Sequence, residues 1–145
     1  MYKTEKQLQQ ACYLHFHNTY PELRKCLFMA KNEGSAANYR GMGLVPGVAD
    51  LCGCINGLFV SFELKLDGTR HEVKRLREQL QWRDQIITNG GFHSFVWDSD
   101  QFATTLKAII NGHVAREQTH IRVLHPLAVI VKAARKNTKT AKLNF

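Results

Sequence analysis

The chain has 145 residues, 44% of them hydrophobic and 22% charged, and its formal net charge is +8. This length fits one domain with a core of its own, and no apolar run approaches the about 20 residues that span a bilayer. Because the first residues also lack the apolar core of a signal peptide, we expect a protein without membrane segments that stays in the cytoplasm of the cell that makes it.

A first helix is expected to begin at Thr4, because Thr4 and Gln7 have the spacing of a capping box. Apolar residues then recur at helical spacing as far as Phe16. Pro21 either closes this stretch or opens a short second turn. Five glycines or prolines lie between Gly34 and Gly47 and predict a long loop, which in a compact domain often has a function.

Two strands, at residues 48–54 and 59–65, flank Asn56-Gly57, which is the typical sequence of a type I′ hairpin turn. With these two turn residues, paired positions sum to 113, and Asp50 lies opposite Glu63 with their Cβ atoms about 5 Å apart. A bulge would shift this register. Lys65 shares a face with Glu63 because side chains two apart in a strand point the same way.

A helix is expected over residues 73–88, ended by Gly90-Gly91, followed by a strand at 92–97. Asp98 then caps a helix that reaches about residue 110. The order helix, strand, strand, helix, strand, helix predicts an α/β or α+β core over residues 1–112.

Residues 113–145 form a basic extension with seven basic residues and one acidic residue, so this segment carries +6 of the net charge. A positive balance of this kind indicates a polyanionic partner, usually nucleic acid, although a solvated tail has the same composition. Residues 127–136 could form a further helix that packs on the domain or on a partner subunit. Among the four cysteines, Cys52 and Cys54 share a strand face; we expect small buried side chains there rather than a metal site.

Two opposed carboxylates on a bare sheet repel each other, and a divalent cation would turn this repulsion into ligation. Asp50 and Glu63 would supply oxygen ligands, and Lys65 would add a positive charge beside them. Such a group can hydrolyse a phosphodiester bond, since a metal polarises the phosphoryl oxygen and a lysine stabilises the developing charge. Taken alone, however, these three residues favour a surface salt bridge on an exposed sheet face, because such a pattern often occurs by chance.

The wider pattern resembles a known family. Gly47-Val48-Ala49-Asp50, then Phe62-Glu63-Leu64-Lys65, then Glu78-Gln79 with Trp82 and Gly90 following, are similar in order and spacing to the VRR-NUC branch of the PD-(D/E)XK nucleases. Asn32-Glu33-Gly34 also fits. The resemblance implies a restriction-endonuclease-like fold, with a mixed sheet flanked by helices. One departure is Ala49, which stands where the family has a proline.

The resemblance also implies roles for single residues. Asp50 and Glu63, with the main-chain carbonyl of Leu64, would bind Mg²⁺ or Mn²⁺. Lys65 would be the catalytic lysine, and Gln79 would orient it or the attacking water. Glu5 matches an acidic residue that can join the metal site, although acids are favoured in a first helical turn in any case.

By the same resemblance, we expect a Mg²⁺-dependent DNA endonuclease of the phage or mobile-element type. It would be a homodimer acting on Holliday junctions or other branched DNA, because a two-fold dimer can present two active sites to two strands. Five basic residues could contact phosphates or, equally well, simply form a solvated surface: Arg40, Arg70, Lys74, Arg75 and Arg77.

Two alternatives stay open. One is a DNA-binding module of the same fold that has lost catalysis and acts in recombination or replication. The other is an RNA-binding or structural protein whose basic tail alone engages nucleic acid, in which case deleting residues 113–145 would remove nearly all affinity.

Overall fold

The computed structural model describes residues 1–30, 43, 45–67 and 72–112. Its elements are α1 (Glu5–Thr19), the 3-10 turn η1 (Pro21–Leu23), β1 (Leu27–Met29), β2 (Leu51–Ile55), β3 (Leu58–Leu64), α3 (Val73–Thr88), β4 (Phe92–Val96) and α4 (Ser99–Ile110). The three helices and strands β2, β3 and β4 correspond to elements expected from the sequence. Of the two expectations for Pro21, the second is confirmed, because Pro21 opens the short turn η1. β1 was not expected.

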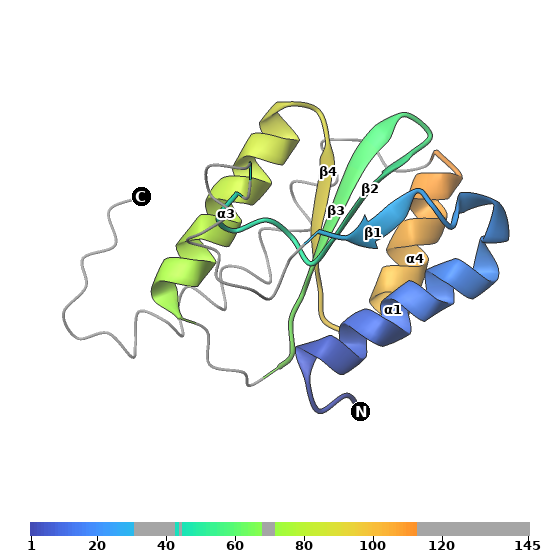
Figure 1. The fold of residues 1–145 in the computed structure, drawn as a ribbon, viewed down its shortest axis with the longest axis horizontal. Coiled ribbons are helices and arrows are strands. Elements are labelled where there is room, and N and C mark those ends of the chain that lie inside the picture. Colours follow the sequence, from blue (N-terminus) through green and yellow to red (C-terminus); the bar gives the residue numbers. More distant parts are fainter. Residues whose placement is uncertain (31–42, 44, 68–71, 113–145) are drawn as a thin grey trace.

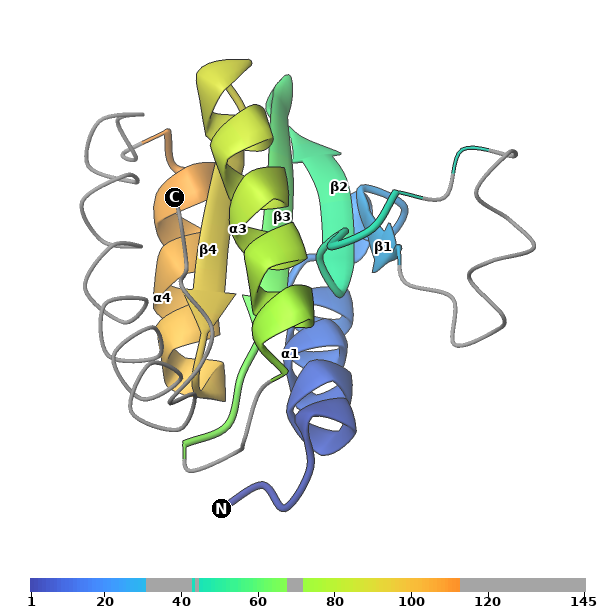
Figure 2. The same cartoon turned by 90° about the vertical axis from the view of Figure 1, so that its left-hand side faces the viewer.

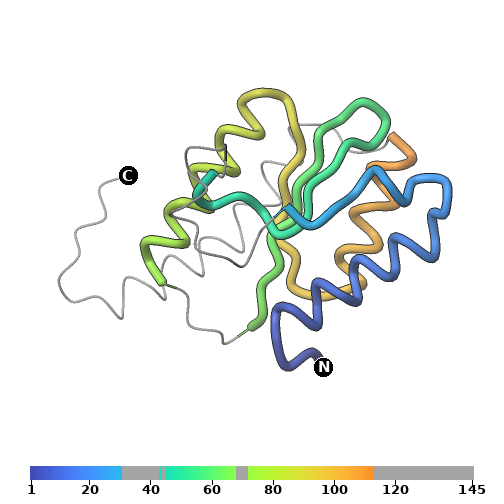
Figure 3. The backbone as a smooth tube through the Cα atoms, viewed as in Figure 1, coloured from blue at the N-terminus to red at the C-terminus, as the bar shows by residue number. Residues whose placement is uncertain are grey.

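The four strands form one mixed sheet in the order β1-β2-β3-β4 (Figure 1). β1, β2 and β3 pair antiparallel, whereas β3 and β4 run parallel. Parallel neighbours need a crossover connection, and α3 provides it before the chain turns back into β4 (Figure 3). α3 covers one face of the sheet, and α1 with α4 covers the other (Figures 1 and 2). The expected α/β class, with a mixed sheet and flanking helices, is confirmed.

The main hydrophobic core lies on the side of the sheet that faces α1 and α4. Its buried members are Leu8, Cys12, Phe16, Leu27, Leu51, Ile55, Val60, Phe62, Leu64, Phe92, Val96, Phe102, Leu106 and Ile109. The alternate residues of the β3 segment, Ser61, Glu63 and Lys65, are buried on the α3 side. The apolar cluster on that side is small, with Leu76 and Phe95 as its buried members. Much of the interior beneath α3 is therefore polar.

The hairpin between β2 and β3 has the expected turn and register. Asn56 and Gly57 both have positive φ, 52° and 75°, as a type I′ turn requires. The ladder pairs residues whose numbers sum to 113, from Ile55 with Leu58 to Leu51 with Phe62. This register fixes which residues of β3 face α3.

The helix starts follow the expected capping residues. The Thr4 hydroxyl accepts from the amide of Gln7 at 3.2 Å, and the Asp98 carboxylate accepts from the amide of Gln101 at 2.7 Å. The other half of the capping box at α1 differs by one residue, because the Gln7 side chain accepts from the amide of Lys3.

β2 begins at Leu51 instead of residue 48, and this expectation was wrong. The chain turns just before it, where the Val48 amide donates to the Val45 carbonyl and Gly47 has φ of +78°. Several expectations lie outside the described residues: the helix at 127–136, the basic extension 113–145, Arg40 and Arg70. In the described part of the chain, no helix is both long and apolar enough to cross a membrane.

Candidate active site

The expected site residues gather where the two parallel strands end. Leu64 and Val96, the last residues of β3 and β4, form a ladder pair, and the amide of Lys65 donates to the Val96 carbonyl at 2.8 Å. α3, which leads back to β4, begins at this same end. Ligands in open α/β sheets bind outside the carboxyl ends of the strands, so this is where a substrate is expected.

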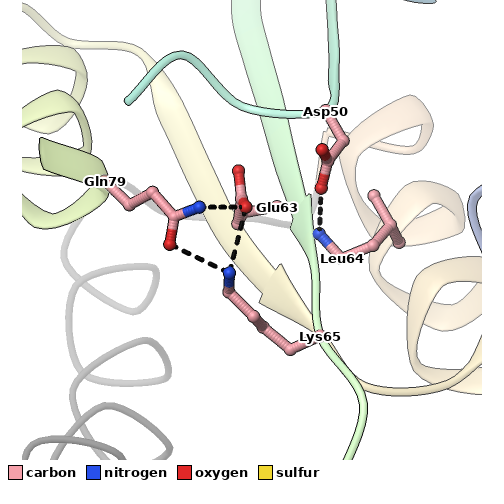
Figure 4. A network of polar contacts seen from close by, with 5 residues as sticks. All are labelled: Asp50, Glu63, Leu64, Lys65 and Gln79. Atoms are coloured by element: carbon pink, nitrogen blue, oxygen red, sulfur yellow. Dashed lines mark hydrogen bonds and ion pairs between the residues drawn. The ribbon is translucent and has the colours of Figure 1, made fainter. Parts of the chain in front are cut away.

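Glu63, Lys65 and Gln79 form one buried network (Figure 4). The ammonium of Lys65 donates to Glu63 Oε1 at 3.1 Å and to Gln79 Oε1 at 2.9 Å. The Gln79 amide also donates to the same Glu63 oxygen. All three residues are at most 1% exposed. Their charges therefore interact in a low dielectric, where each partner fixes the position of the others.

Asp50 lies just before β2, beyond the end of its ladder with β3. The predicted direct cross-strand pairing of Asp50 with Glu63 is not formed, because the last pair is Leu51 with Phe62. Instead, Asp50 Oδ2 accepts a hydrogen bond from the amide of Leu64 at 2.8 Å (Figure 4). The carboxylate of Asp50 is thereby held beside the backbone between Glu63 and Lys65.

Gly47 allows the segment before Asp50 to lie directly on α3. A Cβ atom at this position would be 2.2 Å from the carbonyl oxygen of Glu78 and 2.7 Å from the amide nitrogen of Gln79. At the other end of the segment, the amide of Ala30 donates to the Asp50 carbonyl at 3.1 Å. The loop is thus held between α3 and β1, and this contact explains how Asp50 and Gln79 reach the same site.

The donor atoms at this site suit a hard divalent cation. Asp50 and Glu63 contribute carboxylate oxygens, and the Leu64 carbonyl points to the same edge of β3 as its amide, which Asp50 binds. Mg²⁺ is typically held by one or two carboxylates and keeps several waters. The residues present therefore fit the ion that the sequence implies.

Glu5 is the first residue of α1, which packs on the opposite face of the sheet from α3. Among the described residues, no group of three or more His, Cys, Asp or Glu side chains could hold a metal ion. A part for Glu5 in the metal site stays a prediction.

Three of the expected phosphate contacts can be placed, and all of them are on α3. Lys74 and Arg77 are both exposed in the first half of this helix. Their neighbour Arg75 is exposed as well. The helix therefore carries positive charge at the end where the site lies.

His93 is a buried polar residue on the α3 side of the sheet that the sequence did not single out. It is fully buried in β4 opposite Ser61, and its Nδ1 lies 2.8 Å from the Ser61 hydroxyl. Burial, with the positive charges of Arg83 and Lys65 nearby, lowers the pKa of His93 to about 3. The imidazole is therefore neutral at ordinary pH and adds no third positive charge beneath α3.

Spacing between histidines gave no hint of this position. The usable signal was the alternation of side chains, since a parallel strand beside β3 must place some residue against Ser61. This alternation identifies His93 only once β3 and β4 are known to be neighbouring strands.

The cysteines have no common role in the described structure. Cys52 is buried and Cys54 is exposed, so the expectation of two buried side chains is wrong for Cys54. Burial, reinforced by the charge of Asp98, raises the pKa of the Cys12 thiol to about 12. This residue is therefore an unreactive part of the core.

Comparisons with known proteins add no identification. No family model, no curated protein and no solved structure matches this chain.

Proposed function

We propose that this chain is a metal-dependent nuclease that hydrolyses phosphodiester bonds in DNA. The observation that carries the proposal is the joining of Glu63, Lys65 and Gln79 in one buried network, with Asp50 bound to the backbone between Glu63 and Lys65. These residues come from β3, α3 and the loop before β2. A surface salt bridge, the competing interpretation, would be exposed to solvent.

The motifs that resemble the VRR-NUC branch contain these same four residues. We therefore extend the α/β assignment to a restriction-endonuclease-like fold, as part of the proposal. The polar interior beneath α3 supports this extension, because a sheet face kept for structure alone would be expected to bury apolar side chains.

Asp50, Glu63 and the Leu64 carbonyl would hold Mg²⁺, with Mn²⁺ as a substitute. The bound ion would supply Lewis-acid activation of the phosphoryl group. Lys65 would stabilise negative charge that develops at the phosphorus or help to remove a proton from the attacking water. Gln79 accepts a hydrogen bond from the Lys65 ammonium and would orient it.

DNA is proposed as the substrate because the chain is strongly basic and exposed cations lie in the first half of α3, the helix that carries Gln79. The preference for branched DNA and the homodimer depend on the resemblance alone. Both belong to the proposal as expectations to be tested with it.

The test is to incubate the purified protein with branched, flapped and linear duplex DNA in Mg²⁺, Mn²⁺ or EDTA. Lys65→Ala is assayed beside the wild type, after circular dichroism has shown that it is folded. Lys107→Ala removes an exposed lysine of α4, on the opposite side of the sheet, and serves as the matched control.

Metal-dependent cutting that is lost in Lys65→Ala and kept in Lys107→Ala would support the nuclease. Tight binding without cutting in every metal would overturn the catalytic part. That result would favour a DNA-binding module that has lost catalysis.

A further inference from the structure

The flank of α3 that carries Gln79 can be followed along the helix. Residues three and four apart share a face, so Arg75 and Trp82 lie on the same flank as Gln79. Gln79 is 1% exposed within the buried network. Trp82 is partly buried and packs edge-on against Phe59, with ring centroids 6.4 Å apart. Arg75, one turn before Gln79, is exposed.

This flank is therefore closed against the sheet at Trp82 and Gln79 and open at Arg75. α3 begins where β3 and β4 end, beside Lys65. Arg75 thus lies one helical turn before Gln79, on the exposed part of the flank that carries the buried Glu63–Lys65–Gln79 network.

The two other exposed cations of this half of the helix point elsewhere. With about 100° of rotation per residue, Arg75 lies about 40° from Gln79 around the helix axis, whereas Lys74 lies about 140° away and Arg77 about 160° away. The flank with Lys74 and Arg77 also carries the exposed Gln81 and Asp84. It faces solvent, away from the site.

No ion pair to Arg75 forms among the described residues. Arg75 also lies in the first turn of α3, where the helix dipole favours negative charge; the only acidic residue at this end among the described residues is the N-cap Glu72. An anion bound by Arg75 would offset this unfavourable placement.

We propose that Arg75 binds a phosphate of the DNA backbone at the entrance of the site, one helical turn from Gln79. The inference rests on the proposed function and narrows it. The guanidinium of Arg75 would hold the phosphate through paired hydrogen bonds, while Lys74 and Arg77 contribute only long-range attraction. Of the three exposed cations that the sequence offers in the first half of α3, the proposal thus singles out Arg75.

The experiment compares Arg75→Ala with Arg77→Ala, which removes the same charge from the other flank of the same helix. Binding of a fluorescein-labelled four-way DNA junction to the full chain is measured by anisotropy in EDTA at several salt concentrations. We expect Arg75→Ala to weaken binding about tenfold and to lower the slope of log K against log salt by about 0.9, the value for one phosphate contact. Arg77→Ala should weaken binding less than about threefold. Arg75→Lys keeps the charge but not the paired hydrogen bonds, so we expect an intermediate loss.

Equal losses in Arg75→Ala and Arg77→Ala would overturn the inference, as would an unchanged salt slope in Arg75→Ala. Steady-state cleavage separates this failure from that of the proposed function. If the wild type cuts DNA and both variants have the same KM and kcat, only the contact by Arg75 is wrong. If the wild type binds the junction with the expected difference between variants but never cuts it, the contact is supported and the nuclease is refuted.

Discussion

The ammonium of Lys65 and the carboxylate of Glu63 lie 3.1 Å apart, and both side chains are 1% exposed. Removing two charges from water costs several kcal/mol for each, so such a pair contributes little to stability unless other groups also bind it. Gln79 provides those bonds, since it accepts from Lys65 and donates to Glu63. A site that keeps this arrangement in its interior depends on all three side chains together.

Lys65→Met should lower the free energy of unfolding by about 3 kcal/mol or more, because the Glu63 carboxylate then stays buried without its cation. Urea denaturation followed by tryptophan fluorescence measures this loss. In the double variant Glu63→Gln with Lys65→Met no charge is left, and we expect most of the stability to return. A double variant that is less stable than Lys65→Met would show that the carboxylate does not cause the loss.

Asp50→Asn should separate chemistry from structure. The amide oxygen of asparagine can still accept from the Leu64 amide, which Asp50 now binds at 2.8 Å. We expect stability within about 1 kcal/mol of the wild type and a fall in metal-dependent cleavage of about 100-fold or more, because the ligand has lost its negative charge. Asp50→Ala, which removes the acceptor as well, should lose stability in addition. Full activity of a well-folded Asp50→Asn would argue against a metal ligand at this position.

Gly47→Ala should disturb the site from a distance. The added Cβ would meet the Glu78 carbonyl at 2.2 Å, and α3 or the loop would have to move. Gly57→Ala is the matched control, because its φ of +75° is close to the +78° of Gly47 and nothing lies within 4 Å of the added atom. Both variants bear a backbone cost of about 1–2 kcal/mol, and Gly47→Ala should lose at least about 1 kcal/mol more in urea denaturation. Equal losses of unfolding free energy in the two variants would mean that the loop at Gly47 is not in close contact with α3.

His93 predicts a pH dependence of folding. Its pKa is about 3 in the folded chain, against about 6.5 when unfolded, so below pH 6.5 the unfolded state binds the extra proton. The stability that neutral His93 provides is present above pH 6.5 and is lost as the pH falls toward 3. The slope is about 1.4 kcal/mol per pH unit. His93→Gln cannot titrate, so its unfolding free energy should fall less steeply than that of the wild type between about pH 5.5 and 4. Parallel curves would contradict a neutral, buried histidine.

Short-range signals in the sequence were enough to predict most of the secondary structure. Asn56-Gly57 predicted a type I′ turn, and that turn set the register of β2 and β3. Helical spacing and the following glycines predicted residues 73–88 as a helix, which are the bounds of α3. β1 was not predicted from the sequence, because a strand of three residues, two of them exposed, is too short to show the alternation of buried and exposed side chains.

Prediction of the site was less complete. The alternation within β3 placed Glu63 and Lys65 on one face, and the structure buries both on that face. The expected partner of Asp50 was the Glu63 side chain, but β2 begins one residue after Asp50 and leaves its carboxylate to bind the Leu64 amide. A ladder register holds only as far as the strand continues, and the sequence did not mark that limit.

The sequence alone therefore determined the turn, the helix boundaries and the two faces of β3, because these depend on backbone preferences and on side-chain periods over a few residues. Only the tertiary structure decided that β4 lies parallel beside β3, that His93 meets Ser61, and that Gly47 brings the loop of Asp50 onto α3. These contacts join segments that are far apart in the chain, and they form only when α3 packs across the sheet. Their free energy comes from burying both surfaces together, which no single segment can do by itself.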